Sequence, residues 1–182
     1  MLYTNVLITT VHVQPKLLTY AMDIASGLAF LHGQSIVHGD LHSDNVLLQS
    51  MRRASRVSTE QEPAHVVRSV ACKVSDMGNA RYFGWHAGKT HSMASRLGAL
   101  AYQAPEVLQE GRLSRAADTY SFGCVLWEML AGRQPWASVS QGQLLLRVAV
   151  WGEHEAVPEG CPKALAALLL ACWERVPTAR YG

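Results

Sequence analysis

The segment Asp118–Ala131 constrains the fold more than any other part of the chain, because it is apolar on nearly every side. Its large side chains are those of Tyr120, Phe122, Val125, Leu126, Trp127, Met129 and Leu130. A helix on a protein surface has one apolar face, whereas a helix that is apolar all round is enclosed by neighbouring elements. We therefore predict a central helix inside a helical domain, with Gly132 placed to end it.

Three further segments show the periodicity of helices that bury one face. Between Leu17 and His32 the apolar positions recur in steps of four and three residues. These positions are Leu17, Ala21, Ile24, Leu28 and Leu31. Similar patterns predict helices at Gln143–Val150 and at Lys163–Trp173. Together with the central helix, they indicate a mainly α-helical (α+β) fold class.

Two short strands are predicted at Asn45–Gln49 and Ala71–Ser75, where β-branched side chains favour a pleated, half-buried surface. We expect them to pair as a short β-hairpin. A shorter extended segment is expected at Ser35–His38. Residues 49–71, between the two strands, are assigned to a loop insertion. This segment is rich in arginine, serine and glutamate and has few large apolar groups.

Composition excludes several classes of protein. A chain of 182 residues forms about one domain, and 49% hydrophobic with 16% charged residues is globular composition. A net charge of +2 without a basic run argues against nucleic acid as a partner. The most apolar stretch, Ala164–Trp173, is far shorter than the ~20 residues of a membrane span. Four cysteines without a CxxC pair indicate reduced, buried thiols and a cytoplasmic protein.

The segment from His38 to Asn45, HGDLHSDN, carries the strongest chemical signal. Asp40 and Asn45 are five positions apart and a strand follows at once, so both side chains can face one phosphate site. Taken alone, the same pattern also fits a helix cap or an Asx turn. His38 and His42 have the spacing of a zinc pair. However, Gly39 replaces the glutamate of that motif and no third ligand offers itself.

HGDLHSDN resembles the HRDLKxxN catalytic loop of the protein kinases. The resemblance implies that Asp40 is the base that accepts the proton of the substrate hydroxyl, and that Asn45 is a Mg²⁺ ligand. Further on, KVSDMG resembles the strand and DFG turn of the family. It implies that Asp76 is the carboxylate that holds the magnesium ion bridging the ATP phosphates.

Three later motifs follow in the order of the family: GALAYQAPEVL, DTYSFGCVLWE and the CWER segment. The resemblance covers Leu17 to Arg180 and implies the C-terminal lobe of the kinase fold, in the tyrosine-kinase-like group of serine/threonine kinases. It assigns structural roles to His38 in the catalytic loop, to Asp118 as a partner of that loop's backbone, and to a buried pair of Glu106 with Arg180. Leu47 is expected on the apolar floor of the ATP cleft.

The chain also departs from the family pattern. Gly39, His42 and Ala99 stand where the family has an arginine, a lysine and a threonine, and Met77 replaces the phenylalanine of DFG. No GxG spacing occurs, and no VAIK-like lysine precedes Leu17. Residues 1–182 are therefore interpreted as a partial kinase domain, cut at both ends, with the N-terminal lobe absent. We expect no measurable phosphotransfer from the isolated chain.

The main hypothesis is a protein serine/threonine kinase that uses ATP and Mg²⁺ to phosphorylate a protein substrate. The replacements at Gly39, His42 and Ala99 leave open a pseudokinase that serves as an interaction module. HGDLHxxN also resembles the catalytic loop of aminoglycoside and choline kinases, which would make the chain a small-molecule phosphotransferase. Those enzymes lack the APE segment and the SFG helix that this chain contains.

Overall fold

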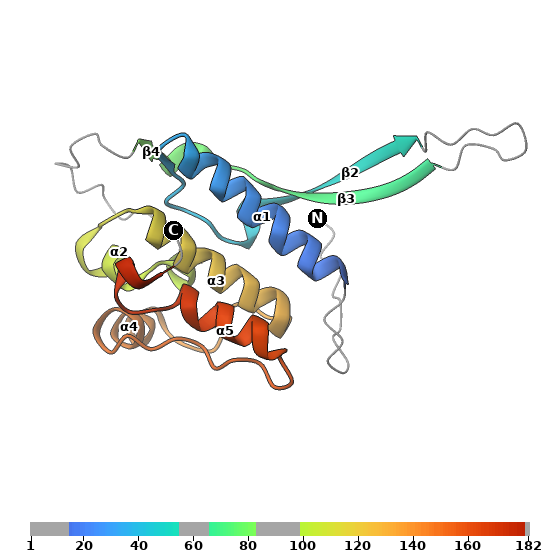
Figure 1. Cartoon of the computed structure of the whole chain (residues 1–182). Helices are drawn as coiled ribbons and strands as arrows, with labels where there is room; N and C mark the ends of the chain where they lie inside the picture. The colour runs from blue at the N-terminus through green and yellow to red at the C-terminus, as the bar shows by residue number, and fades with distance from the viewer. Residues whose placement is uncertain (1–14, 55–65, 83–98, 181–182) are drawn as a thin grey trace, which may run out of the picture.

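The computed structural model describes residues 15–54, 66–82 and 99–180. Helices dominate these ranges, with two antiparallel sheets of two strands each (Figure 1). The helices are α1 (Pro15–Gly33), α2 (Pro105–Glu110), α3 (Arg115–Ala131), α4 (Gln141–Leu145) and α5 (Lys163–Cys172). The strands are β1 (Ile36–Val37), β2 (Val46–Ala54), β3 (Val66–Val74) and β4 (Arg81–Tyr82). The predicted mainly α-helical (α+β) class is confirmed. None of the helices in these ranges is both long and apolar enough to cross a membrane.

Helix α3 is the central helix predicted from its apolar sequence. It lies between α1 and α5 and packs against both (Figure 1). Leu126 and Trp127 are almost completely buried. Ser114 begins the helix by accepting a hydrogen bond from the Ala117 amide, and Gly132 ends it at φ +67°. The structure thus confirms both the helix and its glycine cap.

Helix α1 connects the central helix to the longer strand pair. Leu17, the first of its predicted apolar positions, is partly buried. The other four are buried: Ala21, Ile24, Leu28 and Leu31. On the side of β3, the Asp23 Oδ2 atom accepts a hydrogen bond of 2.8 Å from the Cys72 amide. This bond satisfies an edge amide of a two-stranded sheet, which would otherwise face water.

The two C-terminal helical predictions are confirmed, with small changes in their bounds. Helix α4 begins two residues early because Ser140 and Gln143 form a capping box. The chain then continues as a π-helical turn, Leu146–Val150. Helix α5 buries Leu169 and Cys172, and packs against α3.

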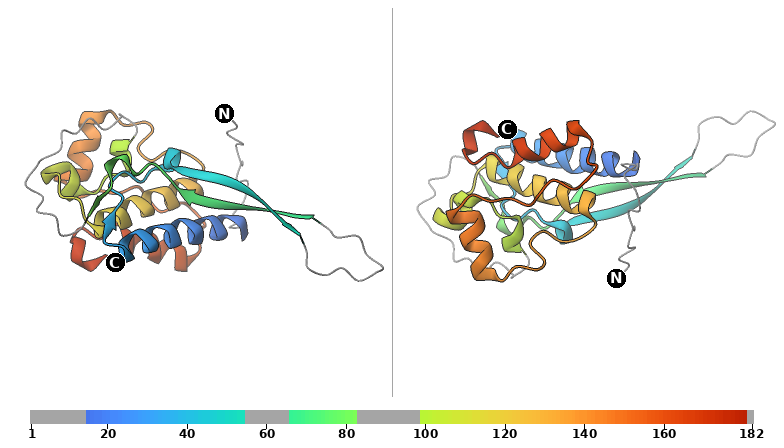
Figure 2. Two further views of the ribbon diagram at one scale, coloured as in Figure 1. Left: turned by 90° about the horizontal axis from the view of Figure 1, so that it is seen from above. Right: turned by 90° about the horizontal axis from the view of Figure 1, so that it is seen from below.

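Strands β2 and β3 form a longer ribbon than the sequence predicted. They pair antiparallel from Val46 opposite Val74 to Ala54 opposite Val66. The expected pairing is present, but residues 50–54 and 66–70, assigned to the loop insertion, are strand; residues 55–65 lie outside the described ranges. An antiparallel ladder is held by backbone hydrogen bonds, so a polar composition does not end it. Both figures show the ribbon projecting beyond the helices (Figures 1 and 2).

Candidate active site

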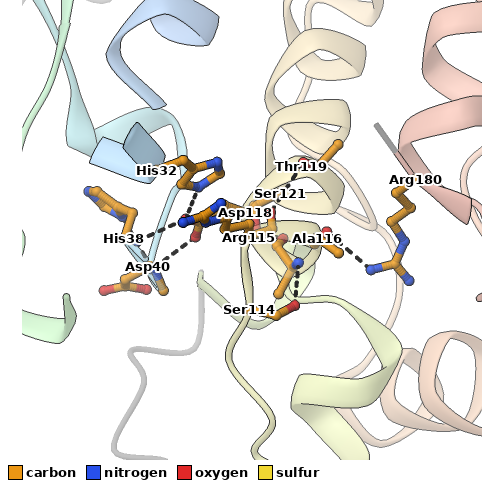
Figure 3. A network of polar contacts seen from close by, with 12 residues as sticks. His32, His38, Asp40, Ser114, Arg115, Ala116, Asp118, Thr119, Ser121 and Arg180 are labelled. Carbon is orange, nitrogen blue, oxygen red and sulfur yellow. Dashed lines mark hydrogen bonds and ion pairs between the residues drawn. The ribbon is translucent and has the colours of Figure 1, made fainter. Parts of the chain in front are cut away.

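A buried carboxylate fixes the loop that carries the predicted catalytic residue. Asp118, in the first turn of α3, is 1% exposed. Its Oδ2 atom accepts a hydrogen bond from the His38 amide and its Oδ1 atom accepts one from the Gly39 amide, both at 2.8 Å. The His32 Nε2 atom lies 2.8 Å from Oδ2 (Figure 3). A buried charge needs such partners, and here they hold the loop backbone against the central helix.

His38 connects the same loop to the segment that precedes Asp76. Its side chain is completely buried. The Asp40 amide donates to the Nδ1 atom at 3.3 Å, so the ring hydrogen lies on Nε2 and is donated to the Ser75 carbonyl at 2.9 Å. His38 therefore acts within the fold as a bridge between two chain segments. Its Nδ1 and Nε2 atoms are both engaged, which leaves neither of them for a metal ion.

Asn45 ties the two segments together a second time. Its Nδ2 atom donates to the Asp40 carbonyl at 2.8 Å. The Asn45 carbonyl in turn accepts the Ser75 amide at 2.9 Å and the Ser75 hydroxyl at 3.0 Å. The side chain is 7% exposed, and its Nδ2 atom is used in the bond to Asp40. Its Oδ1 atom accepts no hydrogen bond from the described residues.

Asp76 begins a 3₁₀ turn, Met77–Asn79, in a conformation that is uncommon for a residue with a side chain. Its φ is +61°, and its Oδ1 atom accepts the Gly78 amide at 3.1 Å. Such left-handed residues outside glycine cluster at functional sites. The turn returns to the catalytic loop, where the Asn79 Nδ2 atom donates to the Asp40 Oδ2 atom at 2.9 Å.

The predicted site residues fall into three groups. Hydrogen bonds join the segments that carry Asp40, Asn45 and Asp76 into one network. Leu47 follows on β2, where it is 54% exposed and lies opposite Lys73. The pair of Glu106 and Arg180 is separate from both.

Arg180 and Glu106 join α2 to the last described turn. The Arg180 Nη1 and Nη2 atoms donate to the two carboxylate oxygens of Glu106 at 2.6 and 3.1 Å. Both residues are buried. This is the pairing that the resemblance implied, and the Arg180 guanidinium also lies over the Tyr120 ring at 5.1 Å.

Sequence reasoning missed several polar residues around the loop. Two of them are His32 and Asn79. Three more are Ser43, Tyr102 and Glu128, which are connected by hydrogen bonds in that order. The Tyr102 hydroxyl donates to Glu128 Oε2 at 2.8 Å and lies 3.2 Å from the Ser43 hydroxyl. Burial raises the pKa of Glu128 and that of Tyr102 above their ordinary values. Each of these residues is a single polar group whose partner is distant in sequence, which leaves no local pattern to find.

The oxygen atoms at Asn45 and Asp76 suit a hard cation. The Asn45 amide nitrogen is engaged, which leaves its Oδ1 atom as a ligand, and Asp76 is exposed with one carboxylate oxygen bonded to Gly78. Magnesium is commonly held by one or two carboxylates together with water and substrate phosphates. By contrast, residues 15–54, 66–82 and 99–180 contain no cluster of three or more His, Cys, Asp or Glu side chains that could hold a metal ion. The donor set therefore fits Mg²⁺ bound with phosphate, and not an all-protein metal cage.

Comparison with known proteins agrees with the fold. A family model described as protein tyrosine and serine/threonine kinase matches residues 8–182. The chain belongs to the protein kinase family, and its described elements are those of the helical C-terminal lobe.

The similar proteins place it in the tyrosine-kinase-like group, as predicted. The chain is 33% identical over 169 residues to mitogen-activated protein kinase kinase kinase 12 of Rattus norvegicus, a match that covers 92% of this chain and 17% of that protein. It is 31% identical over 163 residues to serine/threonine/tyrosine-protein kinase HT1 of Arabidopsis thaliana, covering 90% and 36% of the two chains. It is 33% identical over 167 residues to mitogen-activated protein kinase kinase kinase 10 of Homo sapiens, covering 90% and 16%. The chain thus spans between about a sixth and about a third of these relatives.

Proposed function

We propose that this chain supplies the catalytic loop and the metal-binding turn of a protein serine/threonine kinase. The observation that carries the proposal is the hydrogen-bonded network that joins the segments of Asp40, Asn45 and Asp76. Two buried side chains support this network: Asp118 accepts the His38 amide, and the His38 ring contacts the Ser75 carbonyl. The similar kinases named above support the same class of reaction.

The proposed mechanism assigns one task to each side chain. The Asp40 carboxylate accepts the proton of a serine or threonine hydroxyl as the oxygen bonds to the γ-phosphorus of ATP and the bond to ADP breaks. A base placed in this way contributes about 10² to 10⁴ in rate. The oxygen atoms of Asn45 and Asp76 hold Mg²⁺, which when bound neutralises charge on the phosphate oxygens. Leu47 offers exposed apolar surface at the start of β2 for the nucleotide base.

The test is phosphoryl transfer by the protein expressed from its complete coding sequence. With radiolabelled ATP, Mg²⁺ and a generic protein substrate, we expect phosphoserine and phosphothreonine. Asp40→Asn and Asp76→Asn should each lower kcat by at least about a hundredfold. Glu110→Gln is the matched carboxylate control, because Glu110 lies on the exposed end of α2 and, among the described residues, pairs only with the surface residue Arg112. It should keep the wild-type rate.

The alternatives predict different results in the same assay. A small-molecule phosphotransferase would label an amino sugar in preference to the protein substrate. A non-catalytic interaction module would transfer no phosphate at all. Turnover that survives Asp40→Asn would also contradict the role proposed for that carboxylate.

A further inference from the structure

The carboxylate of Asp40 has one side-chain donor among the described residues, the amide of Asn79. The bond from Asn79 Nδ2 to Asp40 Oδ2 is 2.9 Å long. Hydrogen bonds to a charged acceptor are stronger than neutral ones and fix its orientation. No described residue donates to the other carboxylate oxygen of Asp40, Oδ1. The carboxylate therefore has one occupied oxygen and one that is free of protein donors within the described residues.

The turn that carries Asn79 is itself firmly placed. Asp76 begins it at φ +61° and accepts the Gly78 amide, and the Ala80 amide closes the turn on the Met77 carbonyl at 3.1 Å. The Asn79 carbonyl also lies close to the catalytic loop, 3.3 Å from the point where a Cβ atom on Gly39 would stand. The backbone of the turn thus packs against the catalytic loop at Gly39, and the Asn79 side chain reaches from the turn to the Asp40 carboxylate.

The neighbouring side chains do not compete for this role. Ala99 is buried and has no side-chain donor. The ring of His42 packs near that of Tyr102, with centroids 6.0 Å apart, and its Nδ1 atom lies 3.9 Å from Asp44. Neither residue donates to Asp40.

We propose that Asn79 is a positioning residue for Asp40: its amide holds Oδ2, so that Oδ1 is presented to the acceptor hydroxyl. The inference rests on the proposed function, in which Asp40 is the base. Asn79 lies three residues after Asp76, so one short turn sets the base and the metal-binding carboxylate relative to each other. A base that is free to rotate spends less time in a reactive geometry, and misplacement of a catalytic group by about 1 Å can lower the rate by ~10².

The positioning role is tested by measuring kcat and KM for variants of the protein expressed from its complete coding sequence. Asn79→Ala should lower kcat about tenfold, with KM for ATP and for the protein substrate changed by less than about twofold, because a positioning bond acts on the chemical step. The isosteric Asn79→Asp should lose more, about a hundredfold, because it replaces a donor by a like charge beside Asp40. Arg81→Ala is the matched control: this exposed side chain is two residues further on and, within the part of the chain that the structure describes, donates only to the Ala80 carbonyl. It should keep the wild-type kcat.

A second measurement reports the contact itself and needs no activity. In ¹⁵N-labelled protein, the side-chain NH₂ signals of Asn79 should move when Asp40→Asn removes the charged acceptor. They should stay in place in Asp44→Asn, which removes a different carboxylate of the same loop. Thermal melting of Asn79→Ala should match wild type, because Asn79 is exposed and substitutions of exposed residues usually change stability little.

The two measurements separate the two proposals. Active wild type with full kcat in Asn79→Ala overturns the positioning role and leaves the kinase function standing. Unmoved Asn79 signals in Asp40→Asn overturn the contact, whatever the activity. An inactive wild type with shifted Asn79 signals refutes the role of Asp40 as base, and with it the catalytic part of this inference, while the contact is upheld.

Discussion

Arg180 and Glu106 are 74 residues apart in sequence and form a bidentate, buried ion pair. The same guanidinium donates to the Glu174 carbonyl at 2.6 Å and to the Ala116 carbonyl at 3.2 Å. The pair therefore joins the start of α2, the start of α3 and the segment after α5. A charge pair in this position is tolerated because each of the three guanidinium nitrogens donates to a carboxylate or carbonyl oxygen.

Removing one member of this pair should strongly destabilise the domain. We expect Arg180→Ala to lower the free energy of unfolding by about 3–5 kcal/mol, because the Glu106 carboxylate is then left buried without its counter-charge. Urea unfolding followed by circular dichroism measures the change. The double variant Glu106→Gln with Arg180→Met should be less destabilised than Arg180→Ala. Arg112→Ala breaks the exposed pair with Glu110 and should cost less than about 1 kcal/mol. Equal effects of Arg180→Ala and Arg112→Ala would show that the buried pair is unimportant.

Loss of the Asp118 carboxylate should destabilise the catalytic loop more than it destabilises the helices. In Asp118→Ala the amides of His38 and Gly39 lose their acceptor, and each unsatisfied buried group costs about 1–3 kcal/mol. Hydrogen exchange should therefore accelerate at these two amides by more than at the amides in the middle of α3. Thr119→Ala, one residue further along the same helix, is the control. Uniform acceleration throughout the protein would point to global unfolding instead.

Gly123 should tolerate no side chain, although it lies within α3. A Cβ atom there would stand 2.7 Å from the Cβ atom of Cys172 and 2.9 Å from Nε1 of Trp173. Gly123→Ala should therefore cost about 1–3 kcal/mol through overpacking between α3 and α5. Gly142→Ala is the matched substitution in α4, where nothing lies within 4 Å, and it should raise stability by up to about 1 kcal/mol. If both variants melted above wild type, the close contact between α3 and α5 would be wrong.

The four thiols should differ in their rates of alkylation. Burial raises the pKa of Cys72 and of Cys172 from 9.0 to about 11, and raises that of Cys124 further. A rise of two pKa units leaves about a hundredfold less thiolate at pH 8, and the thiolate is the reactive form. Cys161 is only partly buried, so it should react first with iodoacetamide. Mass spectrometry of timed digests gives the order, and urea should remove the differences. Cys124 labelled as fast as Cys161 in the folded protein would contradict the packing around α3.

The helices were predictable because the spacing of their apolar residues shows which faces are buried. The all-apolar α3, the one-sided pattern of α1 and the cap at Gly132 each follow from side-chain burial and backbone geometry. The cysteines show the limit of such patterns: the sequence analysis predicted buried thiols throughout, and this is wrong for Cys161, which lies between Gly160 and Pro162 and is only partly buried.

The extent of the β2–β3 ribbon was not predictable from composition. Residues 50–54 include Arg52 and Arg53, which indicate a loop by polarity, yet their backbone continues the ladder opposite Arg68 and Val67. The bonds of a ladder join backbone groups, so polar side chains on the strands do not prevent it.

The candidate site was predictable only in part, for a related reason. The motifs HGDLHSDN and KVSDMG identified Asp40, Asn45 and Asp76, because the proposed chemistry requires these residue types at these positions. It missed Asn79 and His32, because an isolated polar residue gives no signal until the fold brings its acceptor close.

The ribbon of β2 and β3 also places the last residue of β2 far from the candidate active site (Figure 1), which is useful for distance measurements. Nine residues of strand span about 30 Å, so the last residue of β2 lies roughly that far along the chain from Asn45. A fluorophore attached through Ala54→Cys would therefore sit at a distance suited to energy transfer measurements. Its dye partner belongs on the helical body, at a position away from the loop that holds Asp40.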